Sequence, residues 1–133
     1  MLRITVLTVL TAAQFAVAEE LVTLPTRDGV TQSFLLAVPE AAKPAAAAVL
    51  FPGGPGNIRL RRENGEIKFG AGNFLVRSRK MFVDGGVAVA VVDTPSDQPQ
   101  GMDDRFRLGD KQAETVAEIV NWMLKKPHRE NID

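Results

Sequence analysis

The sequence predicts an α/β fold in which an N-terminal hairpin is followed by two parallel strands with helices. Two continuous apolar runs, residues 45–50 and 87–92, are typical of strands buried on both faces, as in a parallel sheet. A helical pattern over residues 72–84 lies between them, which is the order of a βαβ crossover. Two β-prone runs before them, joined by an Asp-Gly pair, predict the hairpin.

The hairpin is predicted from residues 21–24 and 31–38, with the turn at Asp28-Gly29. Asp-Gly is the strongest short-range signal for a tight hairpin turn, because both residues tolerate positive φ. Pro39 ends the second strand because it has no N–H to donate to a ladder. An alanine-rich linker then leads to the first apolar strand.

Two helices follow the hairpin. Asn73 is a good N-cap for the first helix, and Gly85-Gly86 ends it. The second helix runs from Asp110 to the proline at position 127. The predicted apolar face of the first helix consists of Phe74, Leu75, Ser78, Met81 and Phe82. That of the second consists of Ala113, Val116, Ala117, Val120, Met123 and Leu124.

Residues 1–18 have the layout of a secretory signal peptide. Arg3 supplies the positive start, residues 4–13 the apolar middle, and Ala16-Val17-Ala18 the small-x-small cleavage site. The alternative is that this segment is an N-terminal strand or helix of the fold. With the signal peptide, residues 19–133 form the mature domain and the protein is periplasmic or secreted.

The composition excludes several classes of function. Hydrophobic residues make up 45% and charged residues 24%, as in globular proteins. Basic and acidic residues both number 16, so we expect no nucleic-acid partner and no membrane partner. The absence of cysteine excludes thiolate chemistry, and His128 alone cannot build a histidine-rich metal site. We therefore expect no metal and no cofactor.

The chemistry is predicted at the glycine-rich segment 51–56, Phe-Pro-Gly-Gly-Pro-Gly. Ligands bind beyond the carboxyl ends of strands in open α/β sheets, and glycines let backbone N–H groups approach a ligand closely. The segment resembles the oxyanion-hole loop of the α/β-hydrolase family, with Pro52 in place of the usual histidine. The resemblance covers residues 19–133 and implies a partial α/β-hydrolase-like sheet.

This resemblance implies a set of site residues. Gly53 and Gly54 would be the backbone oxyanion donors of a catalytic site, with Gly54 the favoured one. Pro55, Gly56, Asp93 and Ser96 would contact the substrate, a small-molecule ester or amide bound by the full-length parent enzyme.

The nucleophile of the family is missing, because no serine has glycine two residues before and two residues after it. The family's acid and histidine would follow that serine. We therefore expect the N-terminal portion of a serine hydrolase that is inactive alone, so whether the chain is itself an enzyme stays open. The alternative is a non-catalytic exported binding or interaction module.

Other chemistries fit less well. A phosphate loop needs a Lys-Ser/Thr pair that is absent, and in a dinucleotide fingerprint Arg59 would stand where the third glycine belongs. Carboxylate pairs such as Asp93/Asp97 and Asp103/Asp104 are more often solvated than catalytic. The basic segment 57–71 is either a solvated loop or a rim that receives an anionic group. Its basic residues are Arg59, Arg61, Arg62 and Lys68.

The apolar strand at residues 45–51 carries no charge and would be an open edge without a further partner strand. Such edges pair with other chains. We therefore expect the isolated chain to be either poorly stable or self-associating through this strand.

Overall fold

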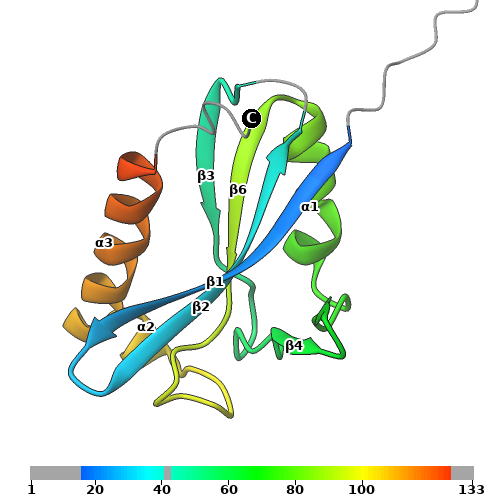
Figure 1. Ribbon diagram of the computed structural model, residues 1–133. Coiled ribbons are helices and arrows are strands. Elements are labelled where there is room, and N and C mark those ends of the chain that lie inside the picture. Colours follow the sequence, from blue (N-terminus) through cyan, green and yellow to red (C-terminus); the bar gives the residue numbers. More distant parts are fainter. Residues whose placement is uncertain (1–15, 41–42, 127–133) are drawn as a thin grey trace, which may run out of the picture.

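A four-stranded sheet lies at the centre of the molecule, with helices on both faces (Figure 1). The computed structural model describes residues 16–40 and 43–126 of the chain. The strand order is β1-β2-β6-β3, so that β1 and β3 lie at the two edges. The pairings β1–β2 and β2–β6 are antiparallel, whereas β3–β6 is parallel.

The predicted hairpin is present and longer than expected. It comprises β1 (Val17–Arg27) and β2 (Val30–Pro39), joined at the Asp28-Gly29 turn, where Gly29 has φ of 68°. The expected signal peptide lies mostly outside the described residues. Its last two residues belong to β1, where Val17 pairs with Pro39 and Ala18 with Val38.

The two apolar strands pair as predicted. In the parallel pair of β3 (Ala46–Leu50) and β6 (Val87–Val92), Ala46 lies opposite Val87 and Leu50 opposite Val91. Helix α1 (Phe74–Asp84) forms the crossover between them. β6 is covered on both faces of the sheet, by α1 on one and by α3 on the other, which explains why its sequence is apolar at every position.

The predicted α/β class is wrong. The described residues are about 35% strand and 28% helix, and the sheet is mixed rather than parallel. The reason is the length of the hairpin, whose strands have 11 and 10 residues, so that antiparallel pairing dominates and only one parallel pair remains. The molecule is a small sheet-rich fold and is not clearly hydrolase-like.

Alternate residues of the strands fill two cores, one on each face of the sheet. On one face Leu35 and Val89 pack with Val76 and Val83 of α1. On the other face Phe34, Ala90 and Val92 pack with Ile119 of α3 (Asp110–Lys125). The ring of Trp122 meets the ring of Phe34 edge to face at 5.3 Å.

The face that each helix buries differs from the prediction. In α1 the buried residues are Val76, Ser78, Arg79 and Val83, whereas Phe74 and Met81 are exposed. Arg79 is buried because its guanidinium bonds to Glu19 of β1 at 2.9 Å and lies over the ring of Phe69. In α3 the buried residues are Gln112, Thr115 and Ile119. Of the predicted apolar face, Val116 and Met123 are half-buried, and the other four residues are exposed.

Short elements occupy segments that the sequence predicted to be irregular. The strands β4 (Arg61–Glu63) and β5 (Glu66–Lys68) form a small exposed hairpin. Helix α2 (Asp104–Arg107) is capped by the side chain of Asp103. Among the described residues, no helix combines the length and apolar character needed to cross a bilayer.

Candidate functional site

The glycine loop follows β3 directly, as predicted. Gly54 and Gly56 have φ of 66° and 78°, a region that residues with a side chain rarely adopt. Within the described part of the chain, the N–H groups of Gly53 and Gly54 donate no hydrogen bond. Both residues are exposed.

The carbonyl groups of this loop are tied to the segment after β6. The guanidinium of Arg107 donates to the carbonyl of Pro52 at 3.3 Å and also to that of Gly54. The N–H of Met102 donates to the carbonyl of Pro55 at 2.8 Å. The loop is therefore held through its acceptors, while two of its donors remain unbonded.

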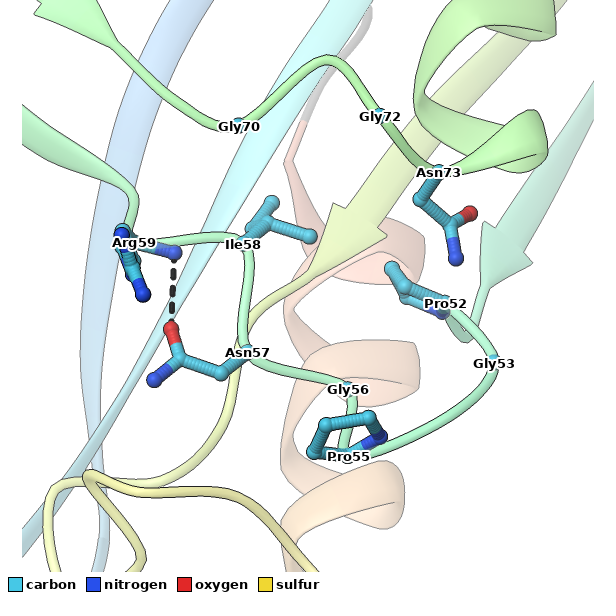
Figure 2. A pocket seen from close by; sticks show the side chains of 10 residues that line it. All are labelled: Pro52, Gly53, Pro55, Gly56, Asn57, Ile58, Arg59, Gly70, Gly72 and Asn73. Carbon is cyan, nitrogen blue, oxygen red and sulfur yellow. Dashed lines mark hydrogen bonds between the residues drawn. The ribbon is translucent and has the colours of Figure 1, made fainter.

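A cavity of about 240 Å³ lies beside the loop. Figure 2 shows how two other segments close around it, the stretch 57–59 and the stretch before α1. Gly53, Pro55 and Gly56 line the cavity, and Gly54 is not among the lining residues. The other lining residues are Pro52, Asn57, Ile58, Arg59, Gly70, Gly72 and Asn73.

The lining of this first cavity carries positive charge and no carboxylate. Arg59 is among the lining residues, and Asn73 caps the N-terminus of α1, its side chain accepting from the N–H of Leu75 at 2.9 Å. A helix N-terminus carries a partial positive charge because its first N–H groups have no partner within the helix. The electrostatics of the cavity thus favour an anionic group.

Asp93 shapes the loop that carries Arg59. One carboxylate oxygen accepts from the N–H of Ile58 at 2.9 Å and from that of Thr94 at 2.8 Å. The other accepts from the N–H of Leu60 at 2.8 Å. Asp93 is buried, so these three bonds hold the backbone on both sides of Arg59, which has φ of 54°.

A second cavity, of about 250 Å³, contains the two substrate contacts predicted after β6, Asp93 and Ser96. The hydroxyl of Ser96 accepts from the N–H of Thr31 at 2.9 Å, and its N–H donates to the carbonyl of Thr31. Asn57 lines both cavities. The structure therefore divides five of the six predicted site residues between two cavities that share Asn57, and Gly54 lines neither. Their contact with a substrate stays a prediction.

The remaining nucleophile and acid candidates are engaged in structural contacts. Ser33 bonds to Thr23 at 2.8 Å, and Ser78 donates to the carbonyl of Phe74. Asp97 pairs with Arg27 at 2.9 Å, and this hydrogen bond lowers the pKa of the carboxyl. His128 lies outside the described residues, within which no group of three metal-ligating side chains occurs.

The basic residues of the expected rim differ in their partners. Arg61 pairs with Glu63 at 2.8 Å and Lys68 pairs with Glu66, while Arg62 donates to the carbonyl of Gly65. In the part of the chain that the structure describes, the guanidinium of Arg59 makes no ion pair or hydrogen bond. Arg59 is thus the one rim residue that both lines the first cavity and is available for a ligand.

Comparison with protein-family models, curated proteins and solved structures gives no match for this chain. The site is therefore interpreted from its own geometry. Sequence reasoning found the glycine loop and Asn73 but missed Arg107, Met102 and Asn57. Nothing near Arg107 and Met102 in the sequence signals that they meet the glycine loop, from which they are 47–55 positions away, and nothing near Asn57 signals its hydrogen bond to the carbonyl of Pro99, 42 positions later.

Proposed function

We propose that the first cavity binds the oxyanion of a small-molecule ligand through the backbone N–H groups of the glycine loop. The observation that carries this proposal is that Gly53 lines the cavity while its N–H is unbonded. Gly54, with an unbonded N–H just outside the lining, is the second donor candidate. Arg59 and the N-terminus of α1 add positive charge on the same cavity.

In this proposal the ligand is an ester or amide, and the chain supplies the oxyanion-binding part of a serine-hydrolase-type site. Preorganised N–H donors stabilise the negative charge that develops on a tetrahedral intermediate, and the loss of one donor costs about 3 kcal/mol in activation free energy. The described residues that line the cavity include no serine, acid or histidine. The chain alone is therefore expected not to hydrolyse esters.

The second candidate is a non-catalytic exported module that binds a stable anion at the same place. The free guanidinium of Arg59 supports it, because a neutral ester carbonyl needs no cation whereas a carboxylate does. Export to the periplasm or outside the cell belongs to both candidates and stays a proposal.

A titration followed by amide NMR tests the binding site. Phenylphosphonate, which imitates a tetrahedral oxyanion, and benzoate, a stable carboxylate, are added separately to ¹⁵N-labelled protein. We expect the amide signals of Gly53, Arg59 and the first turn of α1 to move with one saturation curve. If both anions leave these signals unmoved while shifting others, the cavity is not the binding site.

Two substitutions at one position separate the N–H from the shape of the loop. Gly53→Pro removes the donor, while Gly53→Ala keeps it and adds a Cβ that meets nothing within 4 Å. We expect Gly53→Pro to weaken phenylphosphonate binding about tenfold or more, which is the loss of at least 1.4 kcal/mol, and Gly53→Ala to bind like the wild type. Equal binding by both variants would refute the role of this donor.

An assay with p-nitrophenyl acetate tests the catalytic statement. We expect no turnover above the buffer rate from the chain itself. Turnover that is lost in Gly53→Pro would show that the chain is a complete enzyme, contrary to the proposal. Tighter binding of phenylphosphonate than of benzoate favours the hydrolase candidate, and the reverse order favours the anion-binding module.

A further inference from the structure

A third N–H group of the glycine loop, that of Gly56, also donates no hydrogen bond among the described residues. Unlike Gly53 and Gly54, Gly56 is buried. The backbone N–H of a buried residue rarely lacks a partner in a folded protein, because burial removes the hydrogen bond that it made to water. Gly56 also lines the first cavity, where a bound ligand would supply the missing acceptor.

The segment 102–107, which follows β6 and includes α2, holds the loop by its carbonyl groups. The guanidinium of Arg107 donates from Nη2 to the carbonyl of Pro52 at 3.3 Å. The N–H of Met102 donates to the carbonyl of Pro55 at 2.8 Å. Neither Arg107 nor Met102 is among the residues that line the first cavity. The segment therefore holds the loop from outside the cavity.

These two bonds also set the direction of two N–H groups. The carbonyl of Pro52 shares a peptide unit with the N–H of Gly53, and the carbonyl of Pro55 shares one with the N–H of Gly56. A trans peptide unit is planar, and its C=O and N–H point in opposite directions. Because both carbonyls point toward the segment 102–107, the N–H groups of both glycines point away from it.

Gly54 lacks this arrangement. Its N–H shares a peptide unit with the carbonyl of Gly53, which accepts no hydrogen bond among the described residues. Its own carbonyl accepts from Arg107, but the next residue is Pro55, which has no N–H to direct. Gly54 also lies outside the cavity lining. The loop thus contains two directed donors, and Gly54 is not one of them.

The close approach of the segment 102–107 depends on the glycine at position 56. Gly56 has φ of 78°, and a Cβ there would lie 2.7 Å from Nη2 of Arg107 and 3.1 Å from Cε of Met102. Only glycine leaves this space free. A cationic donor on a carbonyl makes a strong hydrogen bond and polarises the peptide unit, which makes the N–H of the same unit a better donor.

We infer that the N–H groups of Gly53 and Gly56 together bind one anionic group of the ligand, and that Arg107 is the positioning residue that directs the Gly53 donor. The inference rests on the proposed function, because it requires an oxyanion in the first cavity, and it makes Gly56 the second donor in place of Gly54. Figure 2 shows Gly53 and Gly56 on one side of this cavity and the stretch before α1 on the other. A carboxylate or phosphonate has at least two acceptor oxygens and can accept from both donors.

The amide protons of the three glycines test the donor pair in the wild-type chain. Phenylphosphonate is titrated into ¹⁵N-labelled protein, and an amide proton that bonds to the anion moves downfield. We expect Gly53 and Gly56 to move downfield with one saturation curve and Gly54 to move little. No movement of Gly56, or a movement of Gly54 as large as that of Gly53, would overturn the donor pair and leave the proposed function standing. If none of the three moves, the proposed function fails as well.

Substitutions on α2 test the positioning role. Arg107→Met removes the donor to Pro52 and is expected to weaken phenylphosphonate binding about tenfold. Arg105→Met is the matched control, because Arg105 is exposed on the same helix and its loss changes the net charge equally. We expect this control to bind within about twofold of the wild type. Arg107→Lys keeps a cationic nitrogen donor and is expected to recover most of the binding. Equal weakening by Arg107→Met and Arg105→Met would overturn the role of Arg107.

A residue-specific readout separates positioning from a structural role of Arg107. The variants are compared at saturating phenylphosphonate, at a temperature where circular dichroism shows each of them folded. In Arg107→Met we expect Gly53 to lose most of its downfield shift and Gly56, which depends on Met102, to keep its own. An unchanged shift of Gly53, or an equal loss at both glycines, would overturn the positioning role. The wild-type titration tests the donor pair even if Arg107→Met does not fold.

Discussion

The carboxylate of Asp93 is the group whose removal tests the loop architecture most directly. It accepts three backbone N–H groups, from Ile58, Leu60 and Thr94, at 2.8–2.9 Å in a buried position. Asp93→Asn keeps one acceptor oxygen, which can serve Ile58 and Thr94, but turns an NH₂ group toward the N–H of Leu60. One charge-assisted bond is lost, which is worth about 1.5–3 kcal/mol.

We therefore expect Asp93→Asn to lower the free energy of unfolding by about 2 kcal/mol. Asp93→Ala leaves all three N–H groups without this acceptor, and we expect a loss of about 4 kcal/mol. Urea unfolding followed by circular dichroism measures both. With a slope of about 2 kcal/mol per molar urea, Asp93→Asn moves the midpoint by about 1 M.

The matched control is Asp28→Asn at the exposed hairpin turn, where Asn-Gly suits the turn as well as Asp-Gly. We expect it to stay within about 0.5 kcal/mol of the wild type. If Asp93→Asn also leaves the free energy of unfolding unchanged, the carboxylate does not hold the loop around Arg59. The reasoning that links Asp93 to the first cavity is then refuted.

Two further predictions concern contacts that tie distant loops together. The hydrogen bond from Arg27 lowers the pKa of Asp97 below its ordinary value of 3.8, so the stability from this pair is present above that value and is lost as the pH falls through the lowered pKa. The difference in unfolding free energy between wild type and Arg27→Gln should therefore shrink below about pH 4; a constant difference would contradict the assignment. Gly101 has φ of 126°, and a Cβ there would lie 2.5 Å from that of Pro55. Gly101→Ala should cost about 2 kcal/mol or more in thermal or urea unfolding, and a cost no larger than that of Gly53→Ala would contradict the packing.

Local signals in the sequence were sufficient for the boundaries of most elements. The Asp28-Gly29 turn, the cap at Asn73 and the stop at Gly85-Gly86 are all present, because each depends on a few neighbouring residues. The parallel pairing of β3 with β6 was also predicted, since strands without polar positions must be covered on both faces. The glycine loop was predicted because its glycines can adopt the positive φ angles that the loop requires.

What the sequence could not provide depends on partners far along the chain. The fold class was wrong because the register of β1 with β2 extends the hairpin well beyond the run 21–24 that periodicity marks. The buried face of α1 was wrong because Arg79 is paired with Glu19, 60 positions earlier. The hydrophobic pattern predicts that Arg79, as a charged residue, faces solvent. Only the tertiary structure brings the carboxylate of Glu19 and the ring of Phe69 to its guanidinium, and these contacts make its burial favourable.

The site shows the same division. The sequence by itself determined that a flexible, glycine-rich turn with available N–H groups follows a buried strand. The tertiary structure decided which of those groups remain unbonded, because Arg107 and Met102 hold the loop from more than 45 positions away. It also decided that the carboxylate of Asp93 bonds to the backbone N–H groups of Ile58 and Leu60, because only the whole fold brings these groups together.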